Sequence, residues 1–234
     1  MSVILIFLLV MAGFAAWWLS HQRLMAKPWL EQGPLGGFEG SDRSTLPTAK
    51  IGLGVFLAVV GALFALFASA YFMRMELSDW RPLPMPGLLW LNTGVLVLSS
   101  VALQFSLVAS RRDERDLMRL GLMVGGLAAV IFLIGQLIAW QQLVADGYVL
   151  AGNPANSFFY LITGLHGLHI VGGLVALGRT AAGAWGEDRP ERLRLNIELC
   201  AIYWHFLLVI WLAVFVLLAG WAAEFLAVCR QLLI

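Results

Sequence analysis

The sequence has little charge and almost no cysteine. Asp, Glu, Lys and Arg together make up 12% of its 234 residues, against about 25% in soluble domains. The formal net charge of +1 gives no reason to expect a nucleic-acid partner. The two cysteines, Cys200 and Cys229, fit neither a disulfide framework nor a metal-ligand spacing. We interpret both as small apolar side chains.

Recognisable catalytic motifs are also missing from the sequence. There is no nucleophile–base–acid set, no phosphate-binding loop and no thiolate cluster. The histidines are too few for a haem together with a copper centre. No internal repeat supports an inverted-repeat transporter. We therefore expect no catalytic centre in this chain, and no metal or cofactor bound by it.

Apolar residues dominate instead, at 61% of the chain, with a mean hydropathy of +0.85. They form six runs close to the roughly 20 residues that a helix needs to cross a bilayer. None of the runs alternates like a strand of a membrane barrel. We predict an all-α, polytopic membrane helix bundle with six transmembrane helices, at residues 2–20, 51–73, 87–109, 120–143, 157–179 and 197–223.

The predicted helices fall into two parts. The run at 2–20 lacks the basic N-terminal region of a signal peptide, so we interpret it as a retained helix. A loop rich in Gly, Pro and Ser follows at 28–49. We therefore expect an N-terminal transmembrane helix and cytoplasmic loop at 1–49, and a five-helix bundle at 50–234.

Basic residues predict the orientation in the membrane. If the N-terminus lies outside, three Lys or Arg residues fall on the outer side and twelve on the cytoplasmic side. The positive-inside rule favours this arrangement, which places both termini outside. The twelve are Arg23, Lys27, Arg43, Lys50, Arg111, Arg112, Arg115, Arg119, Arg179, Arg189, Arg192 and Arg194.

Ionisable residues inside two apolar runs are the strongest functional signal, because such residues are costly at membrane depth. The run at 157–179 carries His166 and His169, and the last run carries Glu198 and then Tyr203, Trp204 and His205. Both runs also hold small or polar residues that could bring helices together. We therefore take these six residues as candidates for polar contacts between helices or with lipid.

Three interpretations of the histidines remain open at this stage. His166 and His169 share a helix face, and His169 and His205 are predicted at nearly the same depth. Histidines on facing helices could ligate haem, form a polar clamp between helices, or handle protons. We favour the clamp, because nearby glycines permit close helix approach. These glycines are Gly164, Gly167, Gly172 and Gly173.

The apolar runs also hold polar residues whose roles can be interpreted from their positions. Glu198 is either a solvated carboxylate paired with Arg192 or Arg194, or part of one contact face with His205, seven residues later. We interpret mid-membrane Gln136 as a hydrogen-bonding link between helices rather than as a substrate ligand. Ser99 and Ser100 can bond back to their own helix.

The motifs together resemble subunit III of the haem–copper respiratory oxidases, the cytochrome c and quinol oxidases, over about residues 50–223. The most specific signatures are Thr163-Gly164-Leu165-His166-Gly167-Leu168-His169 and Glu198 with Tyr203-Trp204-His205-Phe206. Weaker matches are Lys50 to Tyr71-Phe72, Leu91-Asn92-Thr93, Leu98-Ser99-Ser100, Phe132 and Gln136.

The resemblance implies a non-catalytic subunit of a bacterial terminal oxidase in the inner membrane. Subunit I of such a complex would hold the haem and copper and reduce O2 with proton translocation, beside subunit II. The present chain would stabilise subunit I, support O2 access and proton uptake, and hold phospholipid near Glu198 and His205.

Three departures from the family pattern keep other functions open. Val60, Ala139 and Leu208 stand where the family often has acidic residues. Proton-handling roles of those acids therefore cannot be carried over to this chain. One alternative is an accessory protein of a nitric oxide reductase, which resembles a short subunit III. A freestanding membrane cytochrome b is a second alternative.

Overall fold

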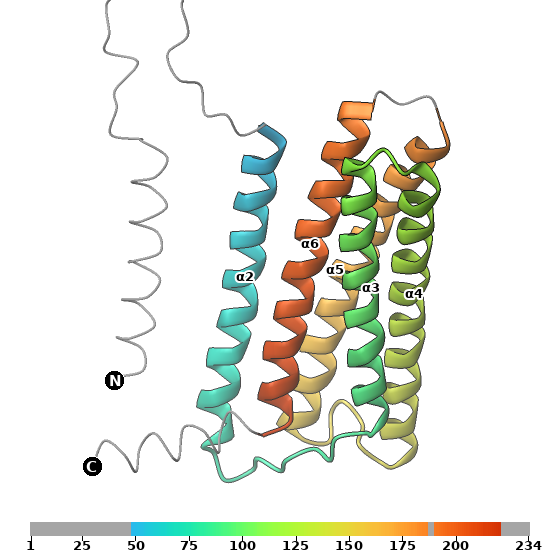
Figure 1. Cartoon of the computed structure of the whole chain (residues 1–234). Coiled ribbons are helices and arrows are strands. Elements are labelled where there is room, and N and C mark those ends of the chain that lie inside the picture. The colour runs from blue at the N-terminus through green and yellow to red at the C-terminus, as the bar shows by residue number, and fades with distance from the viewer. Residues whose placement is uncertain (1–47, 187–189, 221–234) are drawn as a thin grey trace, which may run out of the picture. The chain divides into compact units, whose positions relative to one another are not determined.

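The computed structural model describes residues 48–186 and 190–220, which form helices joined by short loops (Figure 1). The helices are α2 (Thr48–Met75), α3 (Leu88–Arg111), α4 (Arg115–Ala145), α5 (Pro154–Trp185) and α6 (Pro190–Leu218). In this part of the chain, these five helices are long and apolar enough to cross a membrane. Each corresponds to one predicted span from 51 onward. The predicted span at 2–20 and residues 28–47 of the predicted loop lie outside the described residues, whereas the last two residues of that loop, Thr48 and Ala49, belong to α2.

Four of these helices begin before their apolar runs, and the starts of α5 and α6 have local reasons. Asn153 caps α5 by accepting a hydrogen bond from the backbone N–H of Ala155 at 3.3 Å, and Pro154 occupies the first helical position. Pro190 begins α6 in the same way, seven residues before the predicted start. An apolar run marks only the stretch suited to hydrocarbon. The Asn153 cap and the prolines at the first helical positions, rather than hydropathy, therefore mark these helix starts.

The chain divides into two compact units, Met1–Ile51 and Gly52–Ile234, and the second holds helices α3 to α6 and most of α2. Within it, α3 and α4 approach most closely where glycine faces small residues. A Cβ on Gly121 would lie 2.7 Å from Ser106 Cβ and 2.8 Å from the Ala102 carbonyl oxygen. Hydroxyl groups add hydrogen bonds across this contact. Ser106 donates to the Met118 carbonyl at 2.8 Å, and Ser99 donates to the Gly125 carbonyl at 2.7 Å.

Helices α5 and α6 meet where aromatic rings sit on a glycine. A Cβ on Gly173 would lie 2.6 Å from a Tyr203 ring carbon and 2.9 Å from the Trp204 ring. Gly173 therefore provides the close approach expected of the four α5 glycines. Gly172, in contrast, has nothing within 4 Å of its Cβ position. The spacing in the sequence could not tell these two neighbours apart.

Aromatic rings of α2 pack against α5 and the loop that follows α2. Phe64 lies 5.7 Å from the ring of His169 and 6.4 Å from that of His166, measured between centroids. At the end of α2, Tyr71 packs edge-on against Trp80 and Phe158 at 4.8 and 5.7 Å. Only 11% of the most apolar window of α2 is buried, compared with 50% for α3. The other described helices therefore cover only a small part of the α2 surface.

Candidate functional site

Polar side chains of α3 meet polar side chains of α6 at successive levels along an antiparallel contact, which we call the polar seam. The indole N–H of Trp211 donates to Thr93 Oγ1 at 2.9 Å, and that of Trp204 donates to Ser99 Oγ at 2.9 Å. Further along, His205 bonds to both Ser100 and Gln104. The seam ends at the α3–α4 turn, where Arg111 and Glu198 are 3.9 Å apart.

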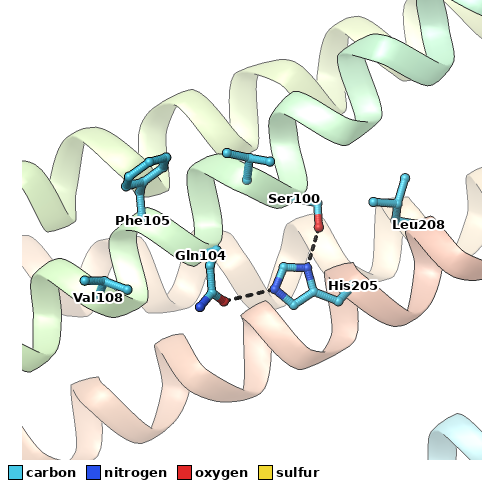
Figure 2. A pocket seen from close by; sticks show the side chains of 7 residues that line it. Ser100, Gln104, Phe105, Val108, His205 and Leu208 are labelled. Atoms are coloured by element: carbon cyan, nitrogen blue, oxygen red, sulfur yellow. Dashed lines mark hydrogen bonds between the residues drawn. The ribbon is translucent and has the colours of Figure 1, made fainter.

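His205 is held by α3 through both of its ring nitrogens (Figure 2). Nε2 lies 3.0 Å from Oε1 of Gln104. Because an amide oxygen only accepts, Nε2 carries the hydrogen, and the Ser100 hydroxyl donates to Nδ1. A neutral imidazole therefore satisfies both contacts. The arrangement fixes the ring without needing a charge inside the membrane.

Beside His205 lies a groove of about 350 Å³. It lies between α3 and α6, and side chains of both helices line it (Figure 2). Most of its lining is apolar, and the polar groups come from the His205 contacts just described. The lining residues are Ser100, Val101, Gln104, Phe105, Val108, His205 and Leu208. An occupant of the groove would therefore contact mainly apolar side chains, and also the polar side chains of Ser100, Gln104 and His205.

The Ser99 hydroxyl joins three helices. It belongs to α3, donates to the Gly125 carbonyl of α4 and accepts from the Trp204 indole of α6. Ser99 is completely buried and Trp204 is 1% exposed, so neither group can turn to solvent instead. Ser99 and Ser100 could each have bonded within their own helix, but the structure gives both of them partners on other helices. Buried hydroxyl groups can form hydrogen bonds with a neighbouring helix when that helix lies close enough.

The two α5 histidines have different surroundings although they share a helix face. His166 is fully buried and its Nε2 lies 3.1 Å from the Leu207 carbonyl of α6. Around it stand the rings of Phe132 at 5.7 Å and Trp211 at 5.0 Å. His169 is half-buried, and its Nδ1 donates to the Leu165 carbonyl of α5 at 2.8 Å. His166 thus links two helices, whereas His169 bonds mainly within its own.

Tyr203 ties α6 to the backbone at His169. Its hydroxyl donates to the His169 carbonyl at 2.8 Å, and its ring stacks 6.2 Å from Phe56 of α2. His205, two residues later, points to α3 instead. The similar depth of His169 and His205 therefore does not make them partners. In the helices described here, no three His, Cys, Asp or Glu side chains converge on a position that could hold a metal ion.

Glu198 and His205 both face α3. Glu198 meets Arg111 of α3, whereas Arg194, one of the two partners predicted for it, lies 3.2 Å from Asp113 in the α3–α4 turn. Glu198 and His205 are seven residues apart, which is about two helical turns, and this spacing explains their shared face. Arg111 comes from the opposite helix, so no local pattern in the sequence identified it.

Some polar residues behave differently from their sequence-based interpretation. Gln104 was not singled out, and a polar side chain inside an apolar run was the signal that could have found it. Gln136 is 4% exposed, and its amide has no hydrogen-bond partner among the described residues. The reading of Gln136 as a hydrogen-bonded link is therefore not supported. The three apolar replacements are also in place: Val60 and Ala139 are buried, and Leu208 lines the groove.

Comparison with known proteins places these features in a family. The model of the family "Cytochrome c oxidase subunit III" matches residues 39–223. The cytochrome c oxidase subunit 3 of Thermostichus vulcanus is 33% identical over 177 residues, which cover 72% of this chain and 85% of that protein. The probable cytochrome c oxidase subunit 3 of Mycobacterium tuberculosis is 31% identical over 175 residues, covering 71% and 84%.

A more distant relative is the cytochrome c oxidase subunit 3 of Emericella nidulans, 28% identical over 187 residues that cover 73% of this chain and 67% of that protein. The matched segment contains all five described helices and the whole polar seam. From the extent of the family match and the identity to these relatives, the chain belongs to the cytochrome c oxidase subunit III family.

Proposed function

We propose that this chain is the non-catalytic subunit III of a bacterial haem–copper terminal oxidase. Family membership implies a complex with other oxidase subunits. In this proposal subunit I carries the haem and copper and reduces O2 with proton translocation, and subunit II is a second partner. The present chain stabilises subunit I and supports its access to O2 and its proton uptake.

The contacts of His205 are the observation that carries a supporting, rather than catalytic, role. Ser100 and Gln104 occupy both ring nitrogens, so the ring already serves to join α3 and α6. His166 similarly joins α5 to the Leu207 carbonyl. A general acid or base must be free to exchange a proton with a reacting group. His205 and His166 instead act as polar links of the kind that hold membrane helices together.

Phospholipid is the ligand that we propose for the end of the seam near the α3–α4 turn. Arg111 is more than half exposed there, and the side chain of Arg194 is 44% exposed. Both arginines come from the side predicted to be cytoplasmic, where basic residues attract anionic head groups. The phosphate would bind beside Glu198 through these guanidinium groups, because the carboxylate alone would repel it.

His205→Ala tests the supporting role in the complete complex. Losing polar contacts within a membrane bundle costs about 0.6 kcal/mol on average, with a maximum near 1.7. Losing a catalytic acid or base costs about a hundredfold or more in rate. We therefore expect initial O2 consumption within a few-fold of the wild type, but weaker retention of this chain during detergent purification.

Met123→Ala is the control for this experiment, because Met123 is an exposed side chain on α4, away from the seam. It should change neither turnover nor retention. If His205→Ala abolishes turnover while the chain remains at full stoichiometry, the supporting role is wrong. Mass spectrometry of co-purified subunits provides the direct check of the partners.

An accessory role in a nitric oxide reductase is the second candidate. The observation that favours it is the apolar character of two buried positions, Val60 and Ala139, where the family often has acids. A complex that does not pump protons would have no use for those carboxylates. Purified complex that reduces nitric oxide, but not O2, would establish this alternative over the first.

A further inference from the structure

The groove beside His205 presents an unused hydrogen-bond donor. Gln104 Oε1 accepts from His205, and Figure 2 shows the amide nitrogen on the side away from the imidazole. In the part of the chain that the structure describes, Nε2 of Gln104 has no hydrogen-bond partner. Because Ser100 donates to Nδ1 of His205, the hydrogen of the imidazole is on Nε2. That N–H turns the amide oxygen of Gln104, rather than its nitrogen, toward His205. The N–H groups of Gln104 therefore point away from His205, on an exposed residue that lines the groove.

Apolar side chains surround this donor. Phe105 is 68% exposed and Val101 is 43% exposed, and both line the groove with Leu208. Isolated apolar residues on this surface need no explanation, because lipid can cover them. A primary amide is different, since polar groups within membrane helices almost always face other protein groups or a water-filled cavity. The groove therefore calls for an occupant that supplies a hydrogen-bond acceptor.

The depth of Gln104 separates two kinds of occupant. It lies seven residues before Arg111, the last residue of α3, which corresponds to about 10 Å along the helix axis. Lipid tails have no acceptor, and the acceptors of a lipid lie at its polar boundary, near the arginine. A neighbouring transmembrane helix can present a serine, threonine, asparagine or glutamine oxygen at any depth.

We propose that the groove formed by Val101, Gln104, Phe105, His205 and Leu208 docks a transmembrane helix of another oxidase subunit, which presents a hydrogen-bond acceptor to the Gln104 amide. This inference rests on the proposed function, because it takes an oxidase complex as the setting. It adds which face of the chain meets the partner and which atom recognises it. Apolar side chains of the partner fill the groove on either side of that bond.

Photo-cross-linking in the intact complex tests the proposal. Phe105 is replaced by benzoylphenylalanine, which keeps an aromatic side chain at the mouth of the groove. The control carries the same residue at Met123 of α4, which is 58% exposed and lies at a similar distance from the α3–α4 turn. We expect a covalent adduct between position 105 and one other oxidase subunit, with at least a fivefold lower yield at position 123.

A second pair of variants tests the hydrogen bond itself. Gln104→Met removes the outward donor and the partner of His205 together, whereas Ser100→Ala removes a partner of His205 but leaves the amide in place. We expect Gln104→Met to speed dissociation of the chain from the complex by about three- to eighteen-fold. Ser100→Ala should have less than half that effect. Equal effects would assign the loss to the seam within this chain and overturn the proposal.

The outcomes also separate this inference from the proposed function. Adducts of position 105 only with lipid, with a second copy of this chain or with another segment of the same chain would overturn the helix-docking proposal. They would leave the subunit III role intact if oxidase subunits still co-purify. If the wild-type chain brings down no oxidase subunit at all, the proposed function itself fails.

Discussion

Helix α4 lies so close to α3 that Gly121 has no room for a Cβ, whereas Gly52 and Gly54 of α2 have nothing within 4 Å of theirs. Both regions are strongly apolar, and both are long enough to span a membrane. Apolarity therefore does not determine how tightly a helix is held. Lipid tails solvate an apolar surface as well as another helix does, so close packing and hydrogen bonds decide the strength of association.

A bulky side chain should destabilise the close contact between α3 and α4 but should be tolerated on α2. Gly121→Leu drives a side chain into Ser106 and the Ala102 carbonyl. Overpacking of this kind typically costs about 1–3 kcal/mol and occasionally more. We expect a large fall in the thermal stability of the detergent-solubilised chain, followed by fluorescence-detected size exclusion. Gly54→Leu on α2 is the matched control, and it should leave the melting profile unchanged. A similar loss in both variants would contradict the comparison.

Removing one hydroxyl should show how much the three-helix contact of Ser99 contributes. Ser99→Ala leaves the buried Trp204 indole without an acceptor, and an unsatisfied buried donor costs about 1–3 kcal/mol. Ser106→Ala loses a single bond to α4, which is worth about 0.6 kcal/mol. Unfolding of both variants in mixed micelles should rank them in this order. Equal destabilisation would mean that the indole bond to Ser99 contributes nothing.

Helix α2 should be held less firmly when it loses an aromatic ring. Phe64→Ala removes the contacts of α2 with His166 and His169, and aromatic pairs are worth about 0.5–1.5 kcal/mol each. We expect a cysteine placed at Val60 to react faster with a membrane-permeant maleimide, because α2 separates more often from α5. The melting temperature of the chain should fall by less than in Ser99→Ala. Unchanged labelling would show that Phe64 does not hold α2.

The smallest effect is expected at the end of α2, in the loop at 76–87. Asp79 accepts two hydrogen bonds from the Arg74 guanidinium, and this contact holds the pKa of the Asp79 carboxyl below its ordinary value. The contact therefore contributes at pH values above about 4 and is lost as pH falls through the lowered pKa. Both groups are exposed, so the contribution is small.

Asp79→Asn tests this contact through proteolysis of the loop. At neutral pH the variant loop should be cut somewhat faster than the wild-type loop. Below the pKa of Asp79 the two should be cut at equal rates, with an acid-stable protease as the probe. A difference that persists or grows in acid would have the wrong sign.

Much of the bundle follows from hydropathy, but its contacts do not. The runs between 51 and 223 located five helices because a bilayer demands long apolar segments. The same demand erases the distinction between core and surface, so Leu208 in the groove and buried Val60 look alike in the sequence. Small residues at Gly121 and Gly125 marked a close contact in principle. Which partner they faced depended on the chain path.

The candidate site shows the same limit. Spacing along one helix was enough to place Glu198 and His205 on a common face. Their partners Arg111 and Gln104 come from another helix, 87 and 101 residues earlier in the chain. Depth estimates suggested a pairing of His169 with His205, and failed because depth says nothing of the direction in which a side chain points. A hydrogen bond between helices requires level, direction and distance together.

The even spacing of the polar seam has a consequence for helix register. Sliding α6 along α3 by one turn, about 5.4 Å, would keep apolar side chains in contact with apolar side chains. It would also separate Trp204 from Ser99, His205 from Gln104 and Trp211 from Thr93 at the same time. Each bond is modest, but all of them are satisfied at only one offset. The seam therefore selects one register of two helices whose apolar surfaces alone would be compatible with several.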